Sequence, residues 1–87
     1  MTEQTTAVIW SINRCPYCEQ AKKILTTQNI PYEERNIQNG DWVKADLAKA
    51  LNVEPDSRIL VPQIFINDKY IGGCDKLIDY FVNMENK

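Results

Sequence analysis

The sequence predicts a single α/β domain in which helices flank a four-stranded mixed sheet, with the elements in the order β-α-β-α-β-β-α. Short runs of β-branched and aromatic residues alternate with segments whose apolar residues recur at helical spacing. The last two apolar runs are separated only by "ND", which indicates a hairpin between them. Because 87 residues can bury one core but not two, we expect residues 1–87 to form one domain.

The first half of the chain predicts two parallel strands joined by a helix. The run "TAVIW" (residues 6–10) is typical of a strand that is buried on both faces. A helix is expected over residues 16–28, and "IPYEERNI" (30–37) begins the second strand. The apolar face of the helix comprises Ala21, Ile24 and Leu25. A helical crossover between two strands of one sheet makes those strands parallel.

The middle of the chain predicts a second helix followed by a loop. "NGD" at residues 39–41 is a turn, and Asp41 is expected to cap the helix that follows it. The residues that recur at helical spacing after this turn are Trp42, Ala45, Leu47, Ala48 and Leu51. The stretch 52–60 is expected to be a loop because it contains turn-forming residues such as Pro55 and Asp56.

The last part of the chain predicts a hairpin and a C-terminal helix. "PQIFI" (62–66) and "KYIGG" (69–73) are expected to be antiparallel strands joined by the two-residue turn "ND". The apolar stripe expected on the final helix consists of Leu77, Ile78, Phe81 and Val82.

The charge balance and the hydropathy pattern argue against nucleic acid and membranes as partners. The net charge is −2, and the ten Lys and Arg residues are scattered along the chain. The chain does not open with a basic segment followed by a long apolar run, as a secretory signal would. Its longest apolar stretches are far shorter than the roughly 20 residues that a transmembrane helix needs. We therefore expect a cytoplasmic protein with no nucleic-acid or membrane partner, and we also expect it to be a monomer.

The motif "RCPYC" places two cysteines, Cys15 and Cys18, three residues apart. Such a pair can hold half of a zinc site, staple a secreted fold or cycle between dithiol and disulfide. An odd count of three cysteines argues against a stapled scaffold. Structural zinc needs four ligands, and this chain offers only Cys74 besides the pair and no histidine. We expect a redox pair and no bound metal, with a metal half-site or a packing accident as the alternatives.

The proline within the motif indicates how the two cysteines differ. Proline is favoured at the first position of a helix, which makes Cys15 the N-cap and Cys18 the third helical residue. The Cys15 sulfur would then face the amides of Tyr17 and Cys18 at the positive helix end, where a thiolate is favoured. Arg14 adds positive charge, and such sites lower a cysteine pKa from near 8.5 to about 3.5 to 7.5. An exposed Cys15 thiolate beside a sheltered Cys18 thiol would form an attacking and resolving pair.

Three segments together resemble the glutaredoxins: "CPYC" after the first strand, "VPQIFI" at the third strand and "IGGCD" before the last helix. The resemblance covers essentially the whole chain and implies the thioredoxin fold. It implies that protein disulfides and glutathione mixed disulfides are reduced through Cys15 as nucleophile and Cys18 as resolving thiol. Glutathione would be the electron-donating co-substrate, and no cofactor would be tightly bound.

The same resemblance implies a glutathione site. The residues that it assigns to this site are Arg14, Tyr17, Val61, Pro62, Gly73, Cys74 and Asp75. Tyr17 would pack along glutathione, and the backbone of Val61, before a cis Pro62, would pair with its cysteinyl part. The start of the last helix would offer N–H groups to the γ-glutamyl carboxylate, and Asp75 would face the ammonium group.

Two positions depart from the family pattern. Many relatives carry Lys or Arg where this chain has Ile12, so Arg14 is the nearest cation for the glycyl carboxylate of glutathione. Arg58 and Gln63 are the other candidates for this contact. Leu60 replaces the family threonine before "VP".

Simpler interpretations exist for several of these residues. Pro62 could be an ordinary trans proline at the start of a strand. Gly72 and Gly73 could merely turn the chain out of the hairpin, and Asp75 could be a plain helix N-cap. Cys74 is expected to be a small packing residue that is neither catalytic nor a metal ligand.

Two rival functions use the same residues. The first is a glutaredoxin-like carrier that receives its electrons from a thioredoxin reductase, against which the "GGCD" segment argues. The second is an iron–sulfur carrier in which two chains share a cluster through Cys15 and glutathione, against which Pro16 and Cys18 argue. Among protein substrates, the resemblance suggests ribonucleotide reductase as a family-typical target.

Overall fold

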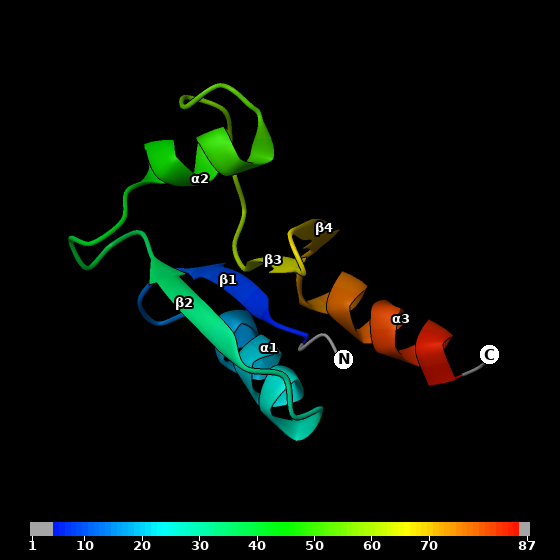
Figure 1. Cartoon of the computed structure of the whole chain (residues 1–87). Helices are drawn as coiled ribbons and strands as arrows, with labels where there is room; N and C mark the ends of the chain where they lie inside the picture. Colours follow the sequence, from blue (N-terminus) through cyan, green and yellow to red (C-terminus); the bar gives the residue numbers. More distant parts are fainter. Residues whose placement is uncertain (1–4, 86–87) are drawn as a thin grey trace.

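The computed structural model describes residues 5–85 and places seven elements in the expected order (Figure 1). The strands are β1 (Ala7–Ser11), β2 (Tyr32–Asn36), β3 (Gln63–Ile66) and β4 (Lys69–Gly72). The helices are α1 (Pro16–Thr27), α2 (Lys44–Leu51) and α3 (Cys74–Glu85). Within the described residues, no helix is both long and apolar enough to span a membrane.

The four strands form one mixed sheet in the order β2-β1-β3-β4. β1 pairs with β2 in parallel and with β3 in antiparallel fashion, and the β3–β4 hairpin is antiparallel. These pairings confirm the expected crossover and hairpin. The turn residues Asn67 and Asp68 both have positive φ angles, 51° and 67°, as a two-residue hairpin turn of the favoured type requires.

The main core lies between the sheet and helices α1 and α3, which pack against each other. Alternate residues of the central strands point into it, since successive side chains of a strand face opposite sides. The buried residues of this core are Ala7, Ile9, Ala21, Leu25, Ile64, Ile66, Cys74, Leu77 and Phe81. The α2 helix lies on the other side of the sheet from α1 and α3 (Figure 1).

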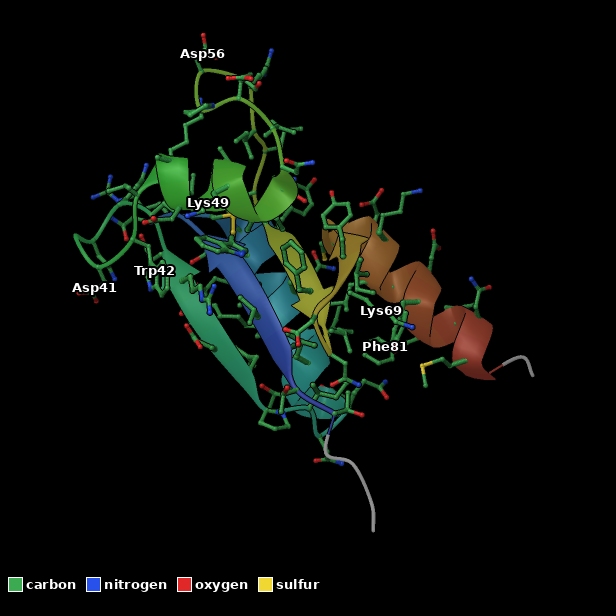
Figure 2. All side chains as sticks on the ribbon, turned by 45° about the horizontal axis from the view of Figure 1, so that its top comes forward. Asp41, Trp42, Lys49, Asp56, Lys69 and Phe81 are labelled. Carbon is green, nitrogen blue, oxygen red and sulfur yellow. A yellow bond between two sulfur atoms is a disulfide. The ribbon has the colours of Figure 1, made fainter. Side chains whose placement is uncertain are left out.

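The start of α2 differs from expectation. The helix begins at Lys44 with Val43 at the N-cap, so Asp41 does not cap it. The carboxylate of Asp46 instead accepts a hydrogen bond from the Val43 N–H at 3.0 Å. Trp42 lies before the helix and packs edge-on against Trp10, with ring centroids 5.4 Å apart (Figure 2). Asp41 lies two residues before the Val43 N-cap, so it is too early in the chain to be the capping residue.

The apolar stripe of α3 is narrower than the sequence predicted. Leu77 is fully buried and Phe81 is 8% exposed, but Ile78 and Val82 are 40% and 44% exposed. One residue along a helix turns the side chain by about 100°, so Ile78 and Val82 leave the face that meets the sheet. The expectation that all four form the buried stripe was wrong for these two.

Candidate active site

The helix start at α1 has the predicted arrangement. Cys15 is the N-cap in an extended conformation, Pro16 is the first helical residue, and the Cys18 N–H donates to the Cys15 sulfur at 3.2 Å. Of the two amides that were expected to donate to this sulfur, that of Cys18 does so. The positive end of α1 therefore points at Cys15, which favours negative charge on its sulfur once the thiol is free.

Cys15 and Cys18 are joined in a disulfide in this structure. Their Cα atoms are 5.2 Å apart, within the usual range for a disulfide of about 4.4 to 6.8 Å, so the helical turn itself brings them together. Cys18 has no exposed surface, whereas Cys15 is 9% exposed. Cys15 is thus the more accessible residue of the pair, although it is more buried than the exposed thiolate that the sequence predicted.

A pocket of about 460 Å³ lies beside this turn and is built from three separate segments. The start of α1, the loop that enters β3 and the start of α3 contribute its walls. The lining residues are Tyr17, Leu60, Val61, Pro62, Gln63, Gly73, Cys74 and Asp75. The fold therefore brings together all but one of the residues that the resemblance assigned to glutathione.

The exception is Arg14, which is exposed and does not line this pocket. Its backbone has a φ of +55°, so the chain makes a left-handed turn immediately before Cys15. Arg58, the other candidate cation, is also outside the lining, whereas Gln63 is part of it.

The loop that enters β3 and the turn before α3 meet closely. The Val61–Pro62 peptide bond is cis, which confirms the expectation from the family pattern. A Cβ atom on Gly73 would lie 3.5 Å from the Pro62 carbonyl oxygen and 3.4 Å from the Asp75 Oδ1 atom. Gly72 has a φ of +122°, and a Cβ atom there would lie 2.9 Å from the Lys76 Cγ atom. The positive φ of Gly72 favours glycine at that position, whereas a Cβ atom on Gly73 would make only ordinary contacts with the proline loop.

The structure also decides between two interpretations of Asp75. The Leu77 N–H donates to the Gly73 carbonyl at 3.0 Å, so α3 begins directly after Gly73. Asp75 is therefore the second residue of the helix and not its N-cap, and its exposed carboxylate borders the pocket. The alternative that Asp75 is a plain N-cap was wrong.

Cys74 lines the pocket but is only 7% exposed. Burial raises the pKa of its thiol, and the negative charge of Asp75 raises it further. A protonated thiol is a poor nucleophile, which agrees with the expected packing role. Among residues 5–85, no group of three or more His, Cys, Asp or Glu residues is placed to hold a metal ion.

A polar network fixes α1 against the strands that lead to the motif. The buried Ser11 hydroxyl donates to the Glu34 carboxylate at 2.7 Å, and the Lys22 ammonium bonds the same oxygen at 3.1 Å. Burial alone would raise the pKa of Glu34, but the hydrogen bonds from Ser11 and Lys22, with the Lys22 charge, lower it below its ordinary value. Lys22 also pairs with Glu19, and this bond is the main reason why the pKa of Lys22 is raised.

Two lining residues, Leu60 and Gln63, were not predicted as parts of the pocket wall. Leu60 is exposed and borders the pocket, yet it was noted only as a departure from the family pattern. Gln63 was considered only as a substitute for a cation. Leu60 and Gln63 flank "VP" in the sequence, and this position could have indicated that both line the same pocket as Val61 and Pro62.

Comparison with known proteins agrees with this geometry. The family model described as Glutaredoxin matches residues 7–71. Glutaredoxin 1 of Rickettsia bellii (strain RML369-C) is 47% identical over 73 residues, which are 83% of this chain and 72% of the relative. The crystal structure of glutaredoxin 1 from Francisella tularensis complexed with cacodylate is similar at a TM-score of 0.71 and 32% identity, covering 95% of this chain and 99% of that one. A buckwheat glutaredoxin–glutathione complex is similar at a TM-score of 0.72 and 27% identity, covering 91% of this chain and 70% of that one.

The match of fold, motif and sequence is sufficient to assign the family. The four-stranded mixed sheet with its three helices is the thioredoxin fold that these structural neighbours share. The Cys15–Cys18 pair lies within the matched residues, at the start of the first helix of this fold. The chain therefore belongs to the glutaredoxin family and is a thiol–disulfide oxidoreductase whose redox pair is Cys15 and Cys18.

Proposed function

We propose that this protein uses glutathione to reduce protein disulfides and glutathione mixed disulfides, with no tightly bound cofactor. The observation that supports this proposal is the pocket beside the start of α1, which residues from three separate segments line. The buckwheat glutaredoxin solved with glutathione is consistent with it. A reducing compartment such as the cytoplasm suits this reaction, because glutathione keeps thiols reduced there.

The mixed-disulfide reaction requires only one enzyme thiol. The Cys15 thiolate attacks the glutathionyl sulfur, the substrate S–S bond breaks, and the substrate leaves as a thiol after taking up a proton. A second glutathione thiolate then attacks the mixed disulfide on Cys15. This step releases oxidised glutathione and regenerates the Cys15 thiolate.

A protein disulfide requires both enzyme thiols. Cys15 attacks one sulfur of the substrate and releases the other as a thiol. Cys18 then attacks Cys15 in the mixed disulfide, which releases the second substrate thiol and forms the Cys15–Cys18 disulfide. Two molecules of glutathione reduce this disulfide and leave as oxidised glutathione, so the two electrons are balanced.

Each wall of the pocket has a proposed role in binding glutathione. Val61 precedes the first paired residue of β3, so its backbone is outside the sheet ladder and available for a strand-like contact with the cysteinyl part. The N–H groups at the start of α3 suit the γ-glutamyl carboxylate, and Asp75 suits the ammonium group beside it. Tyr17 is exposed at the edge of the pocket and packs along the ligand.

The deciding experiment compares two electron donors. The oxidised protein is mixed in a stopped-flow instrument with glutathione, or with NADPH and a thioredoxin reductase, and the loss of the Cys15–Cys18 disulfide is followed. Glutathione should reduce the disulfide at a rate that rises with its concentration, and thioredoxin reductase should be much slower. Faster reduction by thioredoxin reductase would replace this proposal with that of a thioredoxin reductase-dependent carrier.

A further inference from the structure

The loop that enters β3 is tied to the hairpin by two linked side-chain hydrogen bonds. The Tyr70 hydroxyl donates to the Gln63 Oε1 atom at 2.7 Å. The Gln63 Nε2 atom donates to the Leu60 carbonyl oxygen at 2.8 Å. The chain of contacts therefore runs from β4 through β3 to the loop residue that precedes Val61.

The sheet geometry explains why these groups meet. Phe65 and Tyr70 are partners across the β3–β4 ladder, and their rings pack at a centroid distance of 5.4 Å. Gln63 lies two residues from Phe65 on the same strand, so its side chain is on the same face as those two rings. The Tyr70 hydroxyl reaches diagonally across this face to Gln63.

The direction of both hydrogen bonds follows from the Leu60 carbonyl oxygen, which has no hydrogen to donate. A backbone carbonyl can only accept, so the amide nitrogen of Gln63 must face Leu60. The amide oxygen then faces Tyr70, whose hydroxyl must donate. The Leu60 carbonyl thus determines which way the Gln63 amide is turned, and the Tyr70 hydroxyl, by donating to Oε1, holds the amide in that orientation.

The orientation of the Gln63 amide affects the direction of the Val61 N–H group. The Leu60 carbonyl and the Val61 N–H belong to the same planar peptide unit, so the direction of one determines the direction of the other. Leu60 and Gln63 line the pocket, whereas Tyr70 does not. The two hydrogen bonds therefore connect Tyr70, which is outside the lining, to residues that line the pocket.

We propose that Tyr70 is a positioning residue whose hydroxyl, acting through Gln63 and the Leu60 carbonyl, holds the Val61 peptide in the direction needed for the proposed backbone contact with glutathione. This inference rests on the proposed function. It also restricts the role of Gln63, because one of its two amide N–H groups already donates to Leu60, which leaves one for the glycyl carboxylate.

The test is a double-mutant cycle with Tyr70→Phe, Gln63→Ala and the double variant, assayed on a glutathionylated peptide. Tyr70→Phe removes the hydroxyl and keeps the ring that packs on Phe65. It should raise KM about three- to tenfold, the range that corresponds to one neutral hydrogen bond, and leave kcat unchanged because Cys15 is untouched. Gln63→Ala should raise KM at least as much, and adding Tyr70→Phe to it should have no further effect.

Two controls separate this role from a general effect on folding. Tyr80→Phe removes a hydroxyl from a half-buried tyrosine of α3 outside the pocket and should leave KM unchanged. Stoichiometric reduction of a glutathione-free peptide disulfide by the pre-reduced protein should proceed equally in wild type and Tyr70→Phe.

The outcomes are distinct. An unchanged KM in Tyr70→Phe, or additive effects in the double variant, would overturn the positioning role while leaving the proposed function in place. A wild type that reduces the glutathione-free disulfide but shows no saturation with the glutathionylated peptide would overturn the proposed function, and this inference with it.

Discussion

Replacing Asp75 with Asn tests whether glutathione is bound where the pocket indicates. Asp75 is the second residue of α3, borders the pocket and does not cap its helix. The substitution keeps the size of the side chain and removes its charge. Its first expected effect is therefore weaker binding of the glutathione ammonium group, with no change to the start of α3.

The expected magnitude follows from the exposure of this carboxylate. A hydrogen bond to a charged group contributes about 1.5 to 3 kcal/mol, or roughly ten- to hundredfold in affinity. Because the Asp75 side chain is exposed to solvent, we expect the lower end, a rise of about tenfold in KM for a glutathionylated peptide. Loss of an acidic group from the first turn of a helix costs about 0.3 to 1 kcal/mol of stability, so the variant should remain folded.

The assay measures KM and kcat for the glutathionylated peptide, with Asp79→Asn as the matched control. Asp79 lies one helical turn further along α3, is also exposed and does not line the pocket. The Asp79→Asn substitution removes the same net charge from the same helix, so its effect on KM reports any long-range electrostatic contribution. Equal increases in KM for the two variants, or equal losses by Asp75→Asn on a disulfide without glutathione, would refute a direct contact with the ligand.

Three further predictions concern the cysteines and the polar network beneath them. Cys18→Ser should keep activity on glutathione mixed disulfides and lose reduction of protein disulfides, whereas Cys15→Ser should lose both; equal inactivity on a mixed disulfide would contradict the assigned roles. In the reduced protein at neutral pH, iodoacetamide should label Cys15 first, because α1 points its positive end at that sulfur, and Cys74 last, because burial and the neighbouring carboxylate raise the pKa of the Cys74 thiol. Mass spectrometry of timed samples gives the order, and early labelling of Cys74 would contradict it. Glu34→Gln should lower the free energy of unfolding at pH 7 by no more than about 1 kcal/mol, because the ion pair with Lys22 is partly exposed. Since the folded-state pKa of Glu34 is below its ordinary value of 4.5, this contribution is present above 4.5 and should disappear as the pH falls through the folded-state pKa; a difference in urea midpoints that grows at acid pH would contradict the network.

The sequence by itself determined the features that depend on neighbouring residues. Pro16 after Cys15 specifies a helix N-terminus with sulfur at the cap, since proline at the first helical position sets φ and lacks the N–H that this position leaves unpaired. The "ND" pair specifies a tight hairpin because both residues tolerate positive φ. These preferences act within a few residues, and the element order followed from them.

The family pattern also predicted most of the pocket, including the cis bond before Pro62. A pattern of motifs carries this information because it records which distant segments meet in related chains. It could not place Arg14, since the left-handed turn at that residue and the direction of its side chain depend on the packing of this particular chain.

Only the tertiary structure decided the remaining features. Trp42 lies outside the expected helix and packs against Trp10, which is far away in the sequence. Ile78 and Val82 are exposed because the sheet covers only one side of α3. The link from Tyr70 through Gln63 to Leu60 requires a strand, its hairpin partner and a loop to be in register. In each case the residues could satisfy their local conformational preferences in other arrangements as well. The packing of the whole chain therefore selects the observed arrangement, and no short stretch of sequence does so.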